Sequence, residues 1–161
     1  MLGYMLTTLA ENSGEDWSIR TAGTHVVEGA AISGRTRDAL LALDDVGVHQ
    51  FGAHRSRQVT ASDAAWADVI LASEADHVRY VRAVFPEESA KAVQLAQFIH
   101  VAPLDGSFEE RLRVATLVEP SKEFDVADPA GGEQSDYDAC ARELWELAQE
   151  FALLAGAERF L

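Results

Sequence analysis

Short apolar stretches alternate along this chain with segments of helical periodicity, and this alternation is the feature that most restricts its fold. Residues 69–72 are a continuous apolar run, which is typical of a strand buried on both faces of a parallel sheet. Residues 92–95 predict a second strand, and residues 17–21 alternate apolar and polar side chains as a half-buried strand does. Strands that alternate with helices indicate βαβ units, so we expect an α/β protein with a small parallel sheet.

Five segments have the apolar spacing or the caps of helices. No capping residue precedes the first, which predicts that the sequence begins inside a helix. Ser73 and Ser107 are expected N-caps, and Glu110 completes a capping box with Ser107. The residues that define the five helices are Leu2, Met5, Leu6 and Leu9; Ser33, Leu40, Leu43 and Gly47; Ser73, Val78, Val81 and Phe85; Ser107, Glu110, Leu112 and Ala115; and Tyr137, Cys140, Leu144, Leu147, Phe151 and Leu154.

Length and charge narrow the possible functions. With 161 residues and no linker or repeat, residues 1–161 are expected to form one domain. The net charge of −14 argues against nucleic acid or an anionic membrane as a partner. It does not argue against a phosphate ester, because a local cluster of backbone N–H groups can bind an anion on an acidic protein.

The sequence also argues against a membrane or secreted protein. No apolar run approaches the roughly 20 residues that a membrane span requires, and the first residues do not resemble a signal peptide. The single cysteine, Cys140, excludes an internal disulfide and favours a reducing, cytoplasmic compartment. The five histidines lack metal-binding spacing, so no metal or other cofactor is expected.

The stretch Asp125-Val126-Ala127-Asp128-Pro129-Ala130-Gly131-Gly132 is the most informative in the chain. Pro129 favours an extended conformation for Asp128, and the two glycines permit unusual backbone angles. A carboxyl group on such a loop could protonate the leaving oxygen of a phosphate ester. The same residues are also the usual components of a turn, and they leave both interpretations open.

Four sequence blocks in order resemble those of the low-molecular-weight protein tyrosine phosphatases, of bacterial type. The resemblance covers residue 17 to the end of the chain. It implies a three-layer αβα fold, with strand order 2-1-3-4, and no cofactor. The blocks are Thr21-Ala22-Gly23-Thr24, His54-Arg55-Ser56-Arg57-Gln58-Val59-Thr60, Ala67-Asp68-Val69-Ile70-Leu71, and the Asp125 to Gly132 stretch.

This resemblance implies a role for three residues. Asp128 corresponds to the family's general acid. Thr21 and His54 correspond to residues that brace the phosphate-binding loop by hydrogen bonds. Ala130 departs from the family, many of whose members carry an aromatic residue there as one wall of the phosphotyrosine slot.

The family's nucleophile lies in a Cys-x5-Arg loop that follows the first strand, and this sequence has no such motif. Glu146 stands six residues after Cys140, whose place on an apolar helix face predicts a buried structural thiol. The first strand is missing as well, which would leave its two neighbours about 9–10 Å apart, twice the usual strand spacing. We therefore expect the domain to be incomplete at its amino end, and an upstream segment to supply the strand and loop.

Three functions are compatible with these residues. The first is a phosphatase that hydrolyses phosphate monoesters, on a phosphotyrosine protein or a small molecule, through a cysteinyl-phosphate intermediate; residues 1–161 would then be inactive alone. The second is a pseudophosphatase or interaction domain. The third is an arsenate reductase on the same scaffold, which needs several redox cysteines that this chain lacks. The sequence of the polar insert at residues 107–124 does not indicate a particular ligand.

Overall fold

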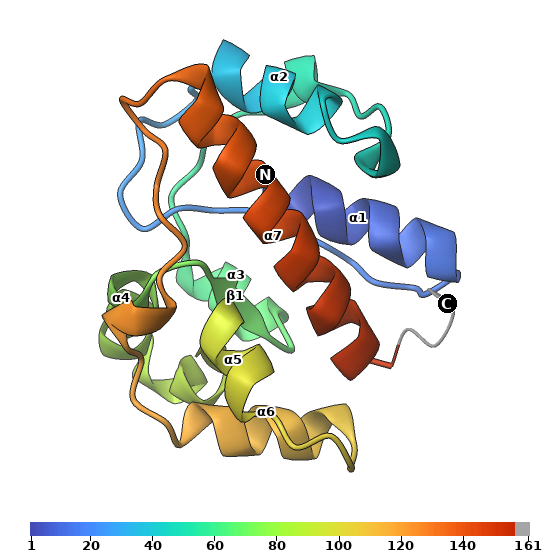
Figure 1. Cartoon of the computed structure of the whole chain (residues 1–161). Coiled ribbons are helices and arrows are strands. Elements are labelled where there is room, and N and C mark those ends of the chain that lie inside the picture. Colours follow the sequence, from blue (N-terminus) through green and yellow to red (C-terminus); the bar gives the residue numbers. More distant parts are fainter. Residues whose placement is uncertain (157–161) are drawn as a thin grey trace. The chain divides into compact units, whose positions relative to one another are not determined.

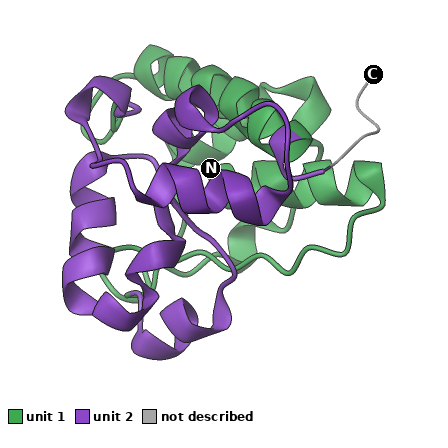
Figure 2. Cartoon of the chain, turned by 90° about the horizontal axis from the view of Figure 1, so that it is seen from below, with its two compact units in different colours: residues 1–58, 127–153, 157–161 green, residues 59–126, 154–156 purple. Residues whose placement is uncertain are grey.

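The computed structural model describes residues 1–156, and these residues form two compact units (Figures 1 and 2). The first unit contains residues 1–58 and 127–153, and the second contains residues 59–126 and 154–156. Helices predominate, and the second unit contains a small parallel sheet. The expected α/β class is therefore confirmed.

The first unit is built from three α-helices and two short 3-10 helices. Its longest helix, α7, carries the last apolar stripe that the sequence predicts. Its elements are α1 (Leu2–Ser13), α2 (Gly34–Leu41), η1 (Asp44–Val46), η2 (Phe51–Ala53) and α7 (Gln134–Leu154).

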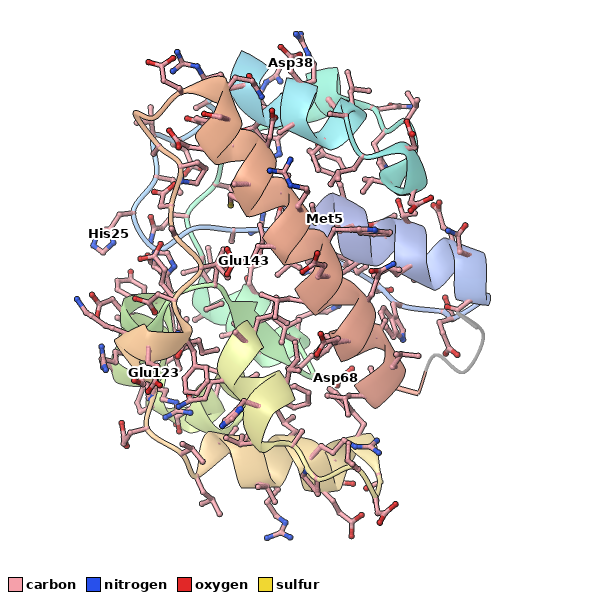
Figure 3. All side chains as sticks on the ribbon, in the orientation of Figure 1. Met5, His25, Asp38, Asp68, Glu123 and Glu143 are labelled. Atoms are coloured by element: carbon pink, nitrogen blue, oxygen red, sulfur yellow. The ribbon has the colours of Figure 1, made fainter. Side chains whose placement is uncertain are left out.

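Helix α1 buries the face that its apolar spacing predicts. Met5, labelled in Figure 3, and Leu9 are almost completely buried, and Leu2 is half-buried. The side chain of the N-cap residue Met1 makes no capping hydrogen bond, as expected for a helix without a capping residue. At the other end Gly14 adopts the left-handed conformation, with φ 72°, which favours glycine.

Helix α7 buries a wider face than the predicted stripe. Cys140, Leu144 and Phe151 are buried as expected, whereas the stripe residues Tyr137, Leu147 and Leu154 are only half-buried. The rest of the buried face is formed largely by small residues, because they allow close packing against the helix backbone. These further buried residues are Ala141, Trp145, Ala148 and Ala152.

Helix α2 is shorter than its apolar spacing predicts. The Ser33 hydroxyl accepts a hydrogen bond from the Thr36 N–H, which confirms the predicted start. The helix ends at Leu41, and Gly47 instead follows the separate 3-10 helix η1. The prediction that one helix extends to Gly47 was wrong.

Residues 17–21 were predicted to be a strand, and they do not form one. The nearest ladder contact is an isolated parallel bridge between Gly23 and Gln58, in which the Gly23 N–H donates to the Arg57 carbonyl over 3.0 Å. A segment becomes a strand only when a neighbouring backbone pairs with it. In the described chain, residues 17–21 take part in no β-ladder.

The second unit contains the two strands that the sequence predicts. Strand β1 pairs in parallel with β2, and Leu71 lies opposite Val93. All three residues of β2 are buried, but β1 is only half-buried, so the expectation of burial on both faces was wrong for β1. The elements are α3 (Ala61–Trp66), β1 (Ile70–Ala72), α4 (Ala75–Val84), η3 (Pro86–Lys91), β2 (Ala92–Gln94), α5 (Leu95–Val101), α6 (Phe108–Thr116) and η4 (Lys122–Phe124).

One of the two predicted serine caps is present in this unit. Ser107 and Glu110 form the expected capping box at the start of α6. Ser73 does not cap α4, since the N-cap residue is Glu74, whose side chain makes no capping hydrogen bond. The carboxylate of Asp125, distant in sequence, instead accepts a hydrogen bond from the Ala75 N–H at 2.7 Å.

Arg111 ties α6 to the chain around it. Its guanidinium donates to the carbonyl oxygens of Pro103 at 2.9 Å, Leu104 at 2.6 Å and Leu154 at 2.9 Å. Carbonyls that end helices and turns lack backbone partners, so these bonds satisfy groups that would otherwise depend on water. No helix in the described part of the chain is long and apolar enough to cross a membrane.

Replacing Arg111 by alanine should lower the free energy of unfolding by about 2 kcal/mol, because three hydrogen bonds from a charged donor are lost. Arg113→Ala is the matched control, since Arg113 lies on the same helix with an exposed side chain. It should change the free energy of unfolding by no more than about 0.5 kcal/mol. Urea unfolding of both variants measures the difference, and equal effects would contradict the assigned role of Arg111.

Candidate active site

The loop that carries Asp128 is a tight turn with an exposed carboxylate. One Asp128 oxygen accepts a hydrogen bond from the Ala130 N–H at 3.0 Å, and the Gly132 N–H donates to the Pro129 carbonyl at 2.9 Å. Gly131 has φ 83°, a conformation that favours glycine. The two interpretations of this sequence are thus compatible: the residues form a turn, and the turn presents a carboxyl group to solvent.

Arg35, from the start of α2, holds the carboxyl end of this loop. Its guanidinium donates to the Gly132 carbonyl at 2.8 Å and lies 3.5 Å from the Glu133 carboxylate. The Gln134 side chain donates back to the Arg35 carbonyl at 3.1 Å. The ion pair is exposed and contributes little, so the hydrogen bond to a fixed carbonyl is the more specific restraint.

Thr21 packs against the first turn of α1. Its methyl group occupies the position that a Cβ atom on Gly3 would take. Gly3 therefore allows the extended segment to approach the helix closely. The Thr21 side chain is otherwise exposed, near the amino end of α1.

His54 follows the 3-10 helix η2 and is half-buried. Its ring centroid lies 6.4 Å from that of Tyr4, in the first turns of α1. Burial lowers the pKa of the imidazole below its usual value, and the positive charges of the Met1 amino group and of Arg55 lower it further. A neutral imidazole can both donate and accept a hydrogen bond, as a bracing residue must.

Cys140 lies on α7, and Asp128 is one of the charged groups that influence it. Burial raises the pKa of its thiol, and the nearby carboxylates of Glu143 and Asp128 raise it too, against the opposing charge of the Met1 amino group. A raised pKa disfavours the thiolate, which is the nucleophilic form. The prediction that Cys140 is a buried structural thiol is confirmed for its burial, and its electrostatic surroundings do not favour reactivity.

The predicted site residues Thr21, His54 and Asp128 all belong to the first unit. The first two lie beside the amino end of α1, and the Asp128 carboxylate influences Cys140, as does the Met1 amino group. The amino end of a helix carries partial positive charge and unpaired N–H groups, so it can stabilise a phosphate. A position that can bind an anion and an exposed carboxylic acid are two of the components that phosphate ester cleavage requires. The third, a Cys-x5-Arg nucleophile loop, does not occur in the sequence.

Other candidates make packing contacts. His49 lies 2.8 Å from the Thr8 hydroxyl and stacks near Tyr4, and His100 lies against Phe124. In the described residues no group of three histidine, cysteine or acidic side chains could hold a metal ion. Arg35 had no role in the sequence interpretation, because only the fold brings it to the loop that carries Asp128, residues 127–132, here called the acid loop. Asp125 belongs to the stretch that the sequence singled out, but its bonds to Ala75 and to the Gln94 side chain were not predicted.

Comparison with known proteins identifies the family of this chain. The family model "Low molecular weight phosphotyrosine protein phosphatase" matches residues 3–158. A protein-arginine-phosphatase from Geobacillus stearothermophilus is 29% identical over 134 residues, which are 83% of this chain and 74% of that protein.

Solved structures have the same fold. The YwlE arginine phosphatase from Geobacillus stearothermophilus aligns with a TM-score of 0.67 and 28% identity, over 94% of this chain and 82% of the other. A low molecular weight protein tyrosine phosphatase from T. tengcongensis aligns with a TM-score of 0.73 and 23% identity, over 94% of this chain and 87% of the other. With a family match along nearly its whole length, this chain belongs to the low molecular weight phosphotyrosine protein phosphatase family.

Proposed function

We propose that residues 1–161 are the acid-loop part of a single phosphatase domain that removes phosphate from proteins. The observation that carries this proposal is the exposed Asp128 carboxylate, on a restrained turn, in a chain whose family match spans both units. Thr21 and His54 would brace a phosphate-binding loop beside the amino end of α1. A cytoplasmic location is part of the same proposal, because a thiolate nucleophile needs a reducing compartment.

The proposed reaction has two steps. A thiolate attacks phosphorus and forms an S–P bond while the bond to the leaving atom breaks, and the Asp128 carboxylic acid gives its proton to that atom. The leaving atom is oxygen in a phosphate ester and a guanidinium nitrogen in phosphoarginine. The Asp128 carboxylate then takes a proton from water, whose oxygen attacks phosphorus. The S–P bond breaks, which releases inorganic phosphate and restores the thiolate.

The thiolate of this mechanism would come from a Cys-x5-Arg loop outside residues 1–161. The strand-like sequence of residues 17–21, which form no strand in the described chain, supports this, since a preceding strand could pair with them. Without such a loop, the same scaffold would be a pseudophosphatase or an interaction domain. With Cys140 alone, an arsenate reductase is disfavoured because that chemistry needs several redox cysteines.

Relatives suggest two substrate classes, phosphotyrosine and phosphoarginine. The Geobacillus relative is named a protein-arginine-phosphatase, whereas the family model is named for phosphotyrosine. Ala130 is exposed and provides no aromatic wall next to Asp128. This favours phosphoarginine as the substrate, because a phosphotyrosine ring would lose a stacking partner.

Purified residues 1–161 should not hydrolyse p-nitrophenyl phosphate, since Cys140 is buried with a raised pKa and no other thiol is present. Release of nitrophenolate, followed spectrophotometrically, measures this. Hydrolysis that vanadate inhibits, and that survives Cys140→Ser, would contradict the proposal. Hydrolysis lost in Cys140→Ser would identify Cys140 as the nucleophile instead.

Fusing the first strand and Cys-x5-Arg loop of the Geobacillus relative ahead of Met1 should restore hydrolysis. In that fusion Asp128→Ala should lower kcat by roughly 10²–10⁴, the usual contribution of a general acid. Asp68→Ala is the matched control, because Asp68 is an exposed aspartate of the second unit (Figure 3). Equal rates in the two variants would remove Asp128 from the mechanism.

The same fusion distinguishes the substrate classes. It should hydrolyse a phosphoarginine peptide with a higher kcat/KM than the matching phosphotyrosine peptide. Ala130→Phe should raise the ratio of phosphotyrosine to phosphoarginine turnover about threefold to tenfold, since a ring pair adds about 0.5–1.5 kcal/mol. A fusion that already prefers phosphotyrosine, with no response to Ala130→Phe, would contradict this substrate assignment.

A further inference from the structure

The segment that leads into the acid loop, residues 119–126, is held by hydrogen bonds to other residues of the second unit. The Gln97 side chain donates to the Glu119 carbonyl at 2.9 Å, and the Arg79 guanidinium donates to the Pro120 carbonyl. At the far end of the segment the Val126 N–H donates to the Ser73 carbonyl at 3.0 Å. The segment is therefore irregular in secondary structure but restrained along its length.

Asp125 is the most highly connected side chain of this segment. One of its carboxylate oxygens accepts hydrogen bonds from the Ala75 N–H and from the Gln94 side-chain amide, each at 2.7 Å. Gln94 is the last residue of β2 and is only 1% exposed, and its side-chain oxygen Oε1 accepts a hydrogen bond from the Ser121 N–H at 3.2 Å. A short bond to a charged acceptor is about twice as strong as a neutral one.

This network ends where the acid loop begins. Val126 is buried and bonded to Ser73, and the chain passes from the second unit to the first between Val126 and Ala127. In the described chain the next restraint from outside the loop is Arg35 on the Gly132 carbonyl. Between these restraints, the loop is held by the two bonds inside its own turn, at Ala130 and Gly132.

We propose that Asp125 is a positioning residue for Asp128. Its bonds to Ala75 and Gln94 fix the backbone at the amino-terminal end of the acid loop, which acts as a pivot. Motion of the loop is then confined to residues 127–131, and this limits how far Asp128 can move. The proposal rests on the proposed role of Asp128 as the general acid. Asp128 follows Asp125 by three residues, so a backbone fixed at Asp125 limits the conformations that the acid loop can adopt.

A simpler role for Asp125 would be to cap α4. The cap would stabilise the first turn of α4 and leave the acid loop unaffected. The two roles differ in which backbone amides respond to a change at Asp125. A cap affects the start of α4 alone, whereas a pivot also affects residues 127–132.

Amide hydrogen exchange on isotope-labelled residues 1–161, read by NMR, separates these roles without any need for catalysis. The variants are Asp125→Ala, which removes both bonds, and Asp125→Asn, which keeps an acceptor oxygen of the same shape. Glu123→Ala is the matched control. Glu123, labelled in Figure 3, is an exposed carboxylate of the same segment.

In Asp125→Ala, we expect the Ala75 and Val126 amides to exchange about tenfold faster or more, and residues 127–132 at least threefold faster. Asp125→Asn should return the loop rates to within about threefold of the original, and Glu123→Ala should leave them unchanged. If Asp125→Ala does not fold, Gln94→Met removes part of the network and should accelerate the same loop amides.

Faster exchange at Ala75 with unchanged exchange at residues 127–132 would overturn the proposal and leave Asp125 as a helix cap. Because residues 1–161 are used as they are, this result does not depend on the proposed hydrolysis. If the loop responds but Asp128→Ala in the fusion does not affect turnover, the pivot stands and the role of Asp128 fails.

Discussion

The need of every extended backbone for a hydrogen-bonding neighbour shapes this structure more than any other constraint. Strands β1 and β2 satisfy each other along three aligned residue pairs, and α4, α5 and α6 belong to the same unit as this small sheet. Residues 17–21 have a strand-like sequence but form no strand in the described chain. Residues 17–21 belong to the first compact unit, whereas β1 and β2 belong to the second.

The acid loop and the segment before it are held by side-chain hydrogen bonds rather than by pairing between strands. Arg35 holds its carboxyl end, and the network of Asp125, Gln94 and Ser73 holds the segment before its amino end. These contacts leave a short turn whose carboxylate faces solvent. Under the proposed function, this loop would close over a leaving group while the bonds at its two ends stay in place.

Local electrostatics explains how a protein with this negative charge can belong to a family of phosphatases. The net charge of −14 disfavours anions at long range, where salt screens it, but the amino end of α1 acts over a few ångströms. The neutral forms of His54 and Cys140 are favoured by burial, so neither adds charge to this region near neutral pH. A phosphate would therefore be recognised by dipoles and N–H groups, and not by a general positive surface.

The helices and the family could be read from the sequence, because helical periodicity, capping residues and ordered motifs are local. The faces of α1 and α7, the capping box of Ser107, and the strands at residues 70–72 and 92–94 all follow from such patterns. Those patterns could not decide whether residues 17–21 pair, where α2 ends, or which carboxylate reaches the first turn of α4. Each of these depends on what another part of the chain brings within hydrogen-bonding distance. Asp128-Pro129 illustrates both sides: the dipeptide indicates a turn, whereas the bond from Arg35 to the Gly132 carbonyl depends on the tertiary structure.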